Sequence, residues 1–371
     1  MNTHCFFIGT TLGENPVSVH CETLARELIG RGHRCVLLTP HRRVDLENHA
    51  GNPAVYTWPS ERPTKWRDAR FLRGLIRQFK PSCLIANFAS VNVMMTQGWL
   101  CRIPVRVAWY HTITSQIEQD HPQSPWKAAL LRVRKRFIYS VATRLAANSH
   151  ASARDARDVF GIPESKIQVF HNALADPMNE DLIDSEIISG RIVCVGRFDP
   201  SKGQDVLIRA LPIVCKKIPS AHVEFIGEGS SMETCKQLAA RLGILERCTF
   251  SGQVGHGEVL RRMSTAVATV VPSRSEAFGL VNIESMAVGT PVIASNVGGI
   301  PEIVRDGVDG LLVPPDNPAA LVAALKTILS DSHLRREMHN NARQRFLSEF
   351  ELTRAVRKQA DWLENELKKH G

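Results

Sequence analysis

The sequence contains no hydrophobic run long enough to cross a bilayer. Nowhere in its 371 residues is there a stretch of the roughly 18 uncharged apolar residues that a membrane-spanning helix requires. The first residues, Met1-Asn2-Thr3-His4, lack the basic start and the small-residue cleavage site of a secretory signal. We therefore expect a cytoplasmic protein, and a peripheral association with the inner face of the cell membrane stays open.

The chain also lacks the spacings of a metal or disulfide site. Its nine cysteines form no Cys-x-x-Cys pair and no cluster with histidine, and no Asp-x-Asp occurs. Several cysteines lie singly within apolar runs, among them Cys5, Cys35, Cys83 and Cys194. We expect buried, reduced thiols in a reducing compartment rather than disulfides or zinc ligands.

The composition excludes several classes of protein. Hydrophobic residues make up 43% of the chain and charged residues 22%, with 24 Gly and 20 Pro. These values are typical of globular proteins and unlike disordered, collagenous or coiled-coil chains. No internal repeat and no low-complexity segment occurs. At about 150 residues per domain, the length predicts two larger domains.

The positive charge is confined to one half of the chain. Residues 1–180 hold 23 Lys and Arg against 14 Asp and Glu, a net charge of +9, whereas residues 181–371 hold 23 of each. The excess is concentrated between Glu61 and Arg144, where 15 basic residues face 4 acidic ones. We expect this half to meet an anionic partner: a phosphate-bearing acceptor, an acidic membrane or nucleic acid.

Short apolar, β-branched runs alternate with amphipathic helical stretches along the whole chain. This pattern is typical of α/β proteins whose parallel strands are joined by crossover helices. Each half predicts its own doubly wound, Rossmann-like sheet. The expected strands are 5–9, 34–39, 83–87, 105–109, 144–147 and 167–170 in the first half, and 191–195, 222–226, 248–252, 266–271, 291–294 and 310–313 in the second.

A polar stretch around Pro177 marks the boundary between the halves. We expect an N-terminal domain over residues 1–175, a linker over 176–189 and a C-terminal domain over 190–350. A closing helix is expected over 351–371, and its packing back on the first domain is left open. In open α/β sheets, ligands bind beyond the carboxyl ends of the strands, so the chemistry is expected in strand-to-helix loops of a cleft between the domains.

The first candidate motif follows strand 191–195 and reads Gly196-Arg197-Phe198-Asp199-Pro200-Ser201-Lys202-Gly203-Gln204. Gly196 opens a loop in which Arg197 and Lys202 stand five residues apart. A planar guanidinium and a compact ammonium group can both reach one phosphate-bearing ligand. We interpret the loop as a diphosphate clamp; a solvated basic loop is the alternative.

The second motif follows strand 266–271 and carries Glu276, Gly279 and Glu284. Gly279 permits a close backbone turn before a helix, whose first N–H groups near Phe278, Gly279 and Leu280 form an anion site reinforced by the helix dipole. Glu276 before the helix and Glu284 inside it can hold different hydroxyls of one extended ligand. Alternatively, Glu276 caps the helix and Glu284 is a surface residue.

The third motif, Gly298-Gly299-Ile300-Pro301-Glu302, follows strand 291–294 and is interpreted as a structural turn leading into a helix. In this order, the three motifs resemble the C-terminal domain of family-four retaining glycosyltransferases of the two-Rossmann-domain (GT-B) type. The likeness continues less sharply through the first half, in Arg31-Gly32-His33, Asn148-Ser149 and residues 169–173.

The resemblance implies a role for each matching residue of the second half. Arg197 and Lys202 match the pair that grips the donor diphosphate. Glu276 matches the glutamate that contacts the transferred sugar, and Glu284 matches the carboxylate that accepts from the ribose hydroxyls. The other donor-binding positions are Gly196, the backbone cradle of Phe278, Gly279 and Leu280, and Gly252, Gln253 and Val254 at the edge of the base.

Two further matches lie in the first half. His111, after strand 105–109, matches a catalytic-site histidine near the donor sugar; a histidine that merely packs beside Tyr110 is the alternative. The first loop departs from the family, because many members carry Gly-Gly where this chain reads Thr11-Leu12-Gly13-Glu14-Asn15-Pro16. Gly13 is expected to allow the same close backbone approach.

The resemblance implies transfer of a sugar, with retention of anomeric configuration, from a UDP- or GDP-sugar to a glycan, a lipid-linked or another hydroxyl acceptor. It also implies that the N-terminal domain binds the acceptor and that the C-terminal domain binds the nucleotide sugar. The residues agree with this chemistry, because Arg197, Lys202 and the helix N-terminus are fixed positive groups for a departing diphosphate. We expect neither a metal nor a cofactor beyond the nucleotide sugar, so chelators are expected to leave activity intact.

Two basic amphipathic stretches, 67–80 and 126–138, combine Arg and Lys with aromatic and aliphatic residues. Such helices can lie on an anionic membrane, and ordinary crossover helices packed on a sheet are the alternative.

Two other functions of the protein stay open as alternatives: a sugar-nucleotide epimerase on the same scaffold, and a non-catalytic protein that binds anionic surfaces. Nucleic acid is not expected as a partner, because the basic region lacks a helix-turn-helix or an aromatic platform.

Overall fold

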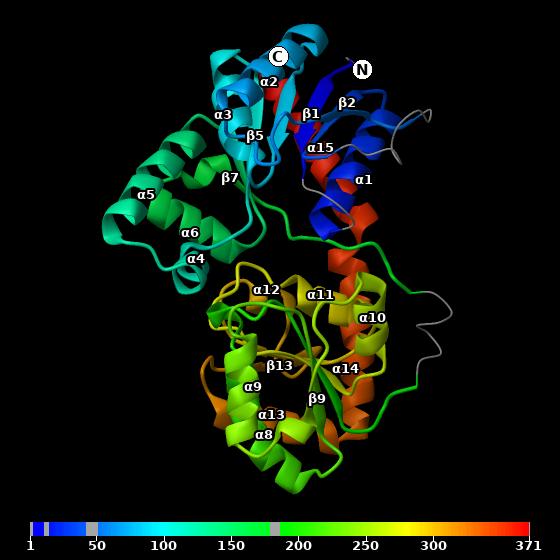
Figure 1. Ribbon diagram of the computed structural model, residues 1–371. Helices are drawn as coiled ribbons and strands as arrows, with labels where there is room; N and C mark the ends of the chain where they lie inside the picture. Colours follow the sequence, from blue (N-terminus) through cyan, green and yellow to red (C-terminus); the bar gives the residue numbers. More distant parts are fainter. Residues whose placement is uncertain (1–2, 11–14, 42–50, 179–185, 371) are drawn as a thin grey trace. The chain divides into compact units, whose positions relative to one another are not determined.

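The computed structural model describes residues 3–10, 15–41, 51–178 and 186–370 (Figure 1). The chain divides into two compact units. The first consists of Met1–His111, Gln123–Leu174 and Leu352–Gly371, and the second of Thr112–Pro122 and Ala175–Glu351. Each unit is built on its own parallel sheet, which confirms the predicted pair of Rossmann-like domains.

The first unit contains a seven-stranded sheet in the order β3-β2-β1-β4-β5-β6-β7, with all neighbours parallel. Its strands are β1 (Cys5–Gly9), β2 (Arg34–Thr39), β3 (Ala54–Thr57), β4 (Cys83–Ala86), β5 (Val105–Tyr110), β6 (Arg144–Ala147) and β7 (Ile167–Val169). Its helices are α1 (Pro16–Gly30), α2 (Trp66–Phe79), α3 (Ser90–Leu100), α5 (Pro125–Ser140), α6 (His150–Phe160) and α15 (Leu352–His370). The strand order reverses between β1 and β4.

The second unit contains a six-stranded parallel sheet in the order β10-β9-β8-β11-β12-β13. Its strands are β8 (Arg191–Val195), β9 (His222–Ile226), β10 (Cys248–Phe250), β11 (Ala268–Val271), β12 (Val292–Ser295) and β13 (Gly310–Val313). Its helices are α4 (Thr114–Asp120), α8 (Gln204–Lys217), α9 (Met232–Arg241), α10 (His256–Ser264), α11 (Leu280–Ala287), α12 (Ile300–Ile303), α13 (Pro318–Ser330) and α14 (Ser332–Arg345). Here the order reverses between β8 and β11.

The inner strands are mostly apolar because helices cover both faces of each sheet. Every residue of β1, for example, is buried. The edge strand β3 was not predicted from the sequence. Its four residues are half-buried or exposed, so it lacks the apolar run that marks the other strands. The remaining predicted strands are confirmed, with ends that differ by no more than two residues.

The C-terminal helix α15 belongs to the first unit and packs along α1; Figure 1 shows the red helix beside the blue one. Its buried side chains recur at helical spacing: Leu352, Val356, Ala360, Leu363 and Leu367. They share a core with the buried face of α1, at Cys21, Leu24, Ala25 and Leu28. Arg31, just after α1, adds an ion pair of 2.6 Å from Nη1 to Oδ1 of Asp361.

Residues 112–122 differ from the expected domain boundary. The sequence assigns them to the first domain, whereas Thr112–Pro122 belong to the second unit. The reason is specific: Asp120, at the end of α4, accepts hydrogen bonds from the backbone N (3.0 Å) and Oγ (2.9 Å) of Ser201. Within the expected linker, Asp176 is also bound to the second unit, by Arg343 at 2.6 Å from Nη2 to Oδ2.

All nine cysteines are free thiols, and six of them are buried, as the sequence predicted. Burial raises the pKa of Cys21 and Cys35 to about 12, which keeps these thiols protonated and unreactive. None of the helices in the described residues has the length and apolar character needed to cross a membrane.

Candidate functional site

Three loops of the second unit come together at the carboxyl edge of its sheet. Residues 196–203 follow β8, residues 272–279 follow β11, and residues 296–299 follow β12. The backbone N of Arg274 donates to the carbonyl of Ser201 at 2.7 Å, which ties the first two loops together. The loops lie at the strand-order reversal between β8 and β11, where doubly wound sheets bind their ligands.

Lys202 and Glu276 form an ion pair at the centre of these loops. Nζ of Lys202 lies 2.6 Å from Oε2 of Glu276, and Oγ of Ser273 donates to the same oxygen at 3.4 Å. Glu276 is 8% exposed. The sequence separates the two residues by 74 positions, so the structure brings together two charged groups from two of its motifs. An anionic ligand at this point would compete with Glu276 for the ammonium group.

Arg197 lies at the rim of the same loop, with 62% of its side chain exposed and Nη1 2.8 Å from Oδ2 of Asp199. Its carbonyl accepts a hydrogen bond of 2.9 Å from Nε2 of Gln204, which is buried. The backbone is therefore held, while the exposed guanidinium pairs with Asp199 and, through Nη2, lies 3.8 Å from Oδ2 of Asp120. Gln204 was not singled out from the sequence, because a backbone acceptor leaves no pattern of residue types.

The turn at Gly298-Gly299 supports the backbone of Glu276. N of Gly299 donates to the carbonyl oxygen of Glu276 at 3.1 Å. Gly298 has φ 54°, in the left-handed region, and a Cβ there would lie 1.8 Å from the same oxygen. The motif is therefore a structural turn, as interpreted from the sequence, and this turn sets the position of the Glu276 loop.

Gly279 immediately precedes α11 and has a left-handed conformation, with φ 101°. N and Nδ2 of Asn282 both donate to its carbonyl oxygen at 3.0 Å, which closes the first turn. The first amides of a helix, here at Leu280 and Val281, have no acceptor within the helix. The side chain of Phe278 is buried against Phe350 in an edge-to-face contact of 6.2 Å, so only the backbone of Phe278 is suited to a ligand.

Glu284 lies inside α11 and pairs with a residue that the sequence interpretation missed. Nε2 of His256, at the start of α10, lies 3.1 Å from Oε1 of Glu284. The loop before α10 contains Gly252, Gln253 and Val254; the carbonyl of Gly252 accepts from N of Gly227 at 2.8 Å. His256 comes only four residues after Gly252, at the start of a helix. This position next to an expected donor-binding loop was the sequence feature that could have marked His256 as a site residue.

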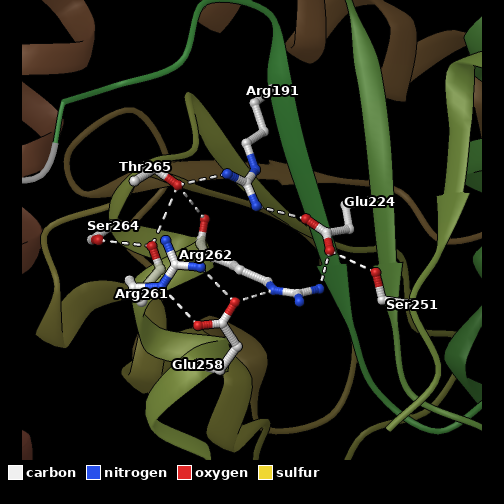
Figure 2. Close-up of polar contacts among 8 residues, drawn as sticks. All are labelled: Arg191, Glu224, Ser251, Glu258, Arg261, Arg262, Ser264 and Thr265. Atoms are coloured by element: carbon white, nitrogen blue, oxygen red, sulfur yellow. Dashed lines mark hydrogen bonds and ion pairs between the residues drawn. The ribbon is translucent and has the colours of Figure 1, made fainter. Parts of the chain in front are cut away.

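A network of charged side chains fixes α10 against the sheet (Figure 2). Glu224 of β9 accepts from Arg191 of β8 at 2.6 Å and is also bonded by Arg262 of α10. Burial would raise the pKa of Glu224, but the hydrogen bond from Ser251 and the two guanidinium groups outweigh it and lower that pKa. Glu258 accepts from Arg262 at 2.7 Å. Because α10 is held in this way, His256 reaches Glu284 from a defined position.

His111 lies in the first unit, directly after β5. Its ring stacks on Trp109, with centroids 5.1 Å apart and 3° between the planes, and on Phe88, at 4.4 Å and 18°. Nε2 of His111 is 2.8 Å from Oδ1 of Asn87, and a carboxamide oxygen can only accept, so Nε2 carries the proton. Burial lowers the pKa of His111 to about 3, with a smaller contribution from His20. The ring is therefore neutral near pH 7.

The structure thus gathers most of the predicted site in one unit. Its second unit holds the predicted residues Gly196, Arg197, Lys202, Gly252, Gln253, Val254, Glu276, Phe278, Gly279, Leu280 and Glu284, whereas His111 belongs to the first. Gly13 lies outside the described residues.

Comparison with known proteins gives the same two-part division. A model for Glycosyltransferase Family 4 matches residues 17–175, and a model for Glycosyl transferases group 1 matches residues 189–345. The chain belongs to the GT-B glycosyltransferases of family 4. Its site loops, 196–203 and 272–279, fall within the group 1 match.

Curated relatives of this family-4 chain agree with it in class, and a solved structure agrees with it in fold. An uncharacterized glycosyltransferase of Methanocaldococcus jannaschii is 26% identical over 354 residues, 88% of each chain. The D-inositol 3-phosphate glycosyltransferase of Mycolicibacterium gilvum is 34% identical over 254 residues, 63% of this chain and 56% of the relative, so the match spans little more than half of that protein. The crystal structure of Anabaena HepE in complex with UDP has a TM-score of 0.77 at 20% identity, covering 98% of this chain and 100% of that one.

Proposed function

We propose that this glycosyltransferase moves a sugar from a nucleoside diphosphate sugar to a hydroxyl acceptor, with retention of configuration and without a metal ion. One observation carries the proposal: Lys202, Glu276 and the start of α11 lie together at the strand-order reversal of the second sheet. These groups match what a sugar diphosphate presents, two phosphates and a ring of hydroxyls. Arg197, on the same loop as Lys202, adds a second cation that can turn toward the phosphates.

The proposed reaction breaks the bond between the sugar's anomeric carbon and the diphosphate oxygen, and forms a bond from that carbon to the acceptor oxygen. The leaving diphosphate gains negative charge, which Arg197, Lys202 and the first amides of α11 stabilise as fixed positive groups. The acceptor attacks from the face that the diphosphate leaves, and its proton passes to a diphosphate oxygen. Because protein cations neutralise the charge, the mechanism requires no metal.

The carboxylates have separate roles in this proposal. Glu276 releases Lys202 to the diphosphate and accepts from hydroxyls of the transferred sugar. Glu284, oriented by His256 at 3.1 Å, accepts from the ribose hydroxyls, and the backbone of Gly252, Gln253 and Val254 meets the base. His111, neutral because burial lowers its pKa to about 3, serves as a hydrogen-bonding group near the sugar rather than as a charged acid.

The donor nucleotide is proposed to be UDP or GDP, and the acceptor a glycan or a lipid-linked hydroxyl compound. Solved structures of similar fold hold UDP and UDP-glucose in the Anabaena protein, which makes uracil the first base to test. The M. gilvum relative is named for D-inositol 3-phosphate, so hydroxyl compounds that carry a phosphate belong among the acceptors to be tried.

We further propose an anionic membrane as a partner, bound through α5 and not through α2. The apolar face of α2 is used in the core, where Leu72, Leu75 and Ile76 are buried. In α5, four apolar side chains at i, i+4, i+7 and i+11 are each at least 50% exposed: Trp126, Leu130, Val133 and Phe137. The helix also carries five basic residues and no acidic one, which suits the inner face of a cell membrane.

Purified protein is to be screened against UDP-, GDP-, ADP- and TDP-sugars with a chelator present, by thermal stabilisation and by release of free nucleoside diphosphate. We expect one donor to stabilise the protein and to be turned over slowly. The absence of any response, or turnover that needs added metal, would overturn the proposal. Complete turnover of the donor to an isomer, with no acceptor consumed, would favour an epimerase.

Liposome sedimentation at low salt tests the membrane proposal separately. We expect binding to vesicles rich in phosphatidylglycerol, and weaker binding by Trp126→Ser. Trp66→Ser is the matched control, because Trp66 is an exposed tryptophan of α2. Equal binding by the two variants would contradict the choice of α5.

A further inference from the structure

An open pocket lies at the amino edge of the first unit's sheet, where the chain leaves α3 and enters β5, with about 770 Å³ of empty space open to solvent. It is lined by Trp99, Leu100, Arg102, Ile103, Pro104 and Arg106. Two of these described residues are basic and none is acidic. His111 follows the other end of β5, so this pocket is separate from the residues assigned to the sugar donor.

The guanidinium of Arg106 is half-buried in this pocket, where its partners are carbonyl groups. Nε of Arg106 donates to the carbonyl of Val141 at 2.9 Å, and Nη1 donates to the carbonyl of Ile103. Burial lowers the pKa of Arg106, and no carboxylate among the described residues opposes that effect. A half-buried cation without an acidic partner is incompletely neutralised, so the pocket favours an anion.

The side chain of Arg106 is also fixed by its packing on α3. A Cβ at Gly98 would lie 3.0 Å from Cδ of Arg106 and 2.6 Å from Cδ1 of Leu84. Glycine at position 98 therefore leaves the space that the stem of Arg106 occupies. Because the stem and Nε are both held, a ligand would meet a guanidinium that is already oriented, which reduces the entropy cost of binding.

Arg102 adds a second cation, in a backbone conformation that suits glycine. Its φ of 56° lies in the left-handed region, in the turn that ends α3, where N of Ile103 donates to the carbonyl of Gly98 at 2.9 Å. Glycine is preferred at this position of such turns, and a residue with a Cβ adopts the conformation at a cost in free energy. The exposed side chain of Arg102 has no hydrogen bond or ion pair with the described residues, so no contact within that part of the chain compensates for the strain.

Apolar side chains form the remaining wall and connect the pocket to α5. Trp99 and Leu100 are 48% and 53% exposed. The ring of Trp99 meets Phe137 edge to face, with centroids 6.3 Å apart, and Phe137 is the last member of the exposed apolar row of α5. Two cationic groups beside a continuous apolar surface suit an amphiphile, a phosphate group that carries hydrocarbon chains, better than a free inorganic ion.

We infer that this pocket binds the headgroup of an anionic phospholipid. The lipid phosphate pairs with the guanidinium groups of Arg102 and Arg106, whose planar forks match phosphate oxygens. The acyl chains lie over Trp99 and Leu100 and continue along the row of α5. This inference goes beyond the proposed function, because it adds one defined lipid site to a surface that could otherwise only adsorb to a membrane. That the lipid belongs to a membrane rests on the proposed contact through α5; that the pocket holds a lipid phosphate does not.

Binding of monomeric lipid separates a defined site from adsorption to a membrane surface. Full-length protein is titrated calorimetrically with dihexanoyl phosphatidylglycerol, below the concentration at which this lipid forms micelles. We expect wild-type protein to bind it at one site, and to bind inorganic phosphate and zwitterionic dihexanoyl phosphatidylcholine at least about tenfold more weakly.

Arg102→Gly is the first variant, because glycine adopts the φ of this position without strain. The change removes a guanidinium and relieves the backbone, so we expect at least about tenfold weaker lipid binding and a Tm no lower than that of wild type. Lys80→Gly is the matched control. Lys80 is an exposed cation after α2 with φ 47°, and it does not line the pocket; this variant is expected to bind as wild type does.

Leu100→Glu is the second variant, because it places a carboxylate on the apolar wall. We expect at least about tenfold weaker lipid binding. Ile213→Glu is its control, since Ile213 of α8 is also 53% exposed and lies in the second unit. Thermal unfolding of all four variants is recorded.

Three results would overturn the inference. The first is no lipid binding by wild-type protein, and the second is equal binding by wild type, Arg102→Gly and Leu100→Glu. The third is binding of inorganic phosphate or of the zwitterionic lipid as tight as that of phosphatidylglycerol, which would indicate a free-anion site or an apolar site instead.

This inference and the proposed functions fail in distinguishable ways. Monomeric lipid binding that depends on Arg102, together with no response to any sugar nucleotide, would leave the lipid site and remove the transferase function. Vesicle sedimentation that depends on Trp126, without binding of monomeric lipid, would leave the membrane contact of α5 and remove the lipid site.

Discussion

Replacing Gly298 by alanine tests whether the turn after β12 sets the position of Glu276. A Cβ at Gly298 would lie 1.8 Å from the carbonyl oxygen of Glu276, whereas real Cβ atoms stay at least 3.0 Å from such atoms. The two loops must therefore separate by about 1.2 Å in a tightly packed region. Glu276 and its ion pair with Lys202 would move with the loop.

The magnitude follows from two separate costs. A side chain in the left-handed conformation costs about 1–2 kcal/mol, and forcing an extra carbon into a packed site costs about 1–3 kcal/mol. We expect a loss of roughly 2–5 kcal/mol for the second unit, at about 2–4 °C in Tm for each kcal/mol. A displacement near 1 Å at a catalytic group lowers turnover by about 10²-fold.

Gly307→Ala is the matched control for this experiment. Gly307 also has a positive φ, 74°, but a Cβ there would meet no described atom within 4 Å. It carries the backbone cost alone, so we expect a Tm loss of only a few degrees and wild-type release of nucleoside diphosphate from the donor. Thermal unfolding and donor turnover are measured on both variants. If Gly298→Ala matched Gly307→Ala in both measurements, the proposed coupling between the turn and Glu276 would be refuted.

Three further predictions concern other parts of the chain. Lys202→Met and Glu276→Gln are each expected to lower donor turnover by at least ~10²-fold, as for removal of a group that stabilises developing charge; near-normal turnover in both would show that the site is assigned wrongly. The pKa of His111 is lowered to about 3, so the unfolded chain binds a proton near pH 6.5 that the folded chain does not. Stability is therefore expected to be complete above pH 6.5 and to fall toward pH 3, by up to about 1.4 kcal/mol per pH unit from this group; thermal unfolding against pH is expected to be flatter in His111→Gln, and an unchanged slope would contradict this. Leu363→Ala removes a fully buried side chain of α15 and is expected to destabilise the first unit by about 2–5 kcal/mol in denaturant unfolding; a loss below about 1 kcal/mol would mean that α15 is not part of that core.

Much of the fold was predictable because its strands are buried on both faces. A run such as Cys5–Gly9 is apolar throughout, and that pattern needs no knowledge of the neighbouring strands. Edge strand β3 was not predicted, because its residues are half-buried or exposed and therefore form no apolar run. The place of residues 112–122 also escaped prediction, because α4 joins the second unit through Asp120 and Ser201, which are 81 positions apart.

Amphipathic pattern alone could not distinguish α2 from α5. Both helices combine basic residues with apolar ones. In α2 the residues Leu72, Leu75 and Ile76 pack in the core, whereas Trp126 and Val133 of α5 are exposed. Which face of a helix is covered depends on the elements that neighbour it, and these come from distant parts of the chain.

The sequence by itself determined the class of fold, the order of the three site motifs and the type of chemical group at each position. These properties are local: strand formation follows from a continuous apolar run, and a phosphate-binding loop follows from glycine and charge within a few residues. Only the tertiary structure decided the partners, such as Lys202 with Glu276, His256 with Glu284, and Phe88 with His111. Each of these contacts joins loops or elements that become neighbours only when the sheet has formed, because parallel strands bring residues from separate crossovers to one edge.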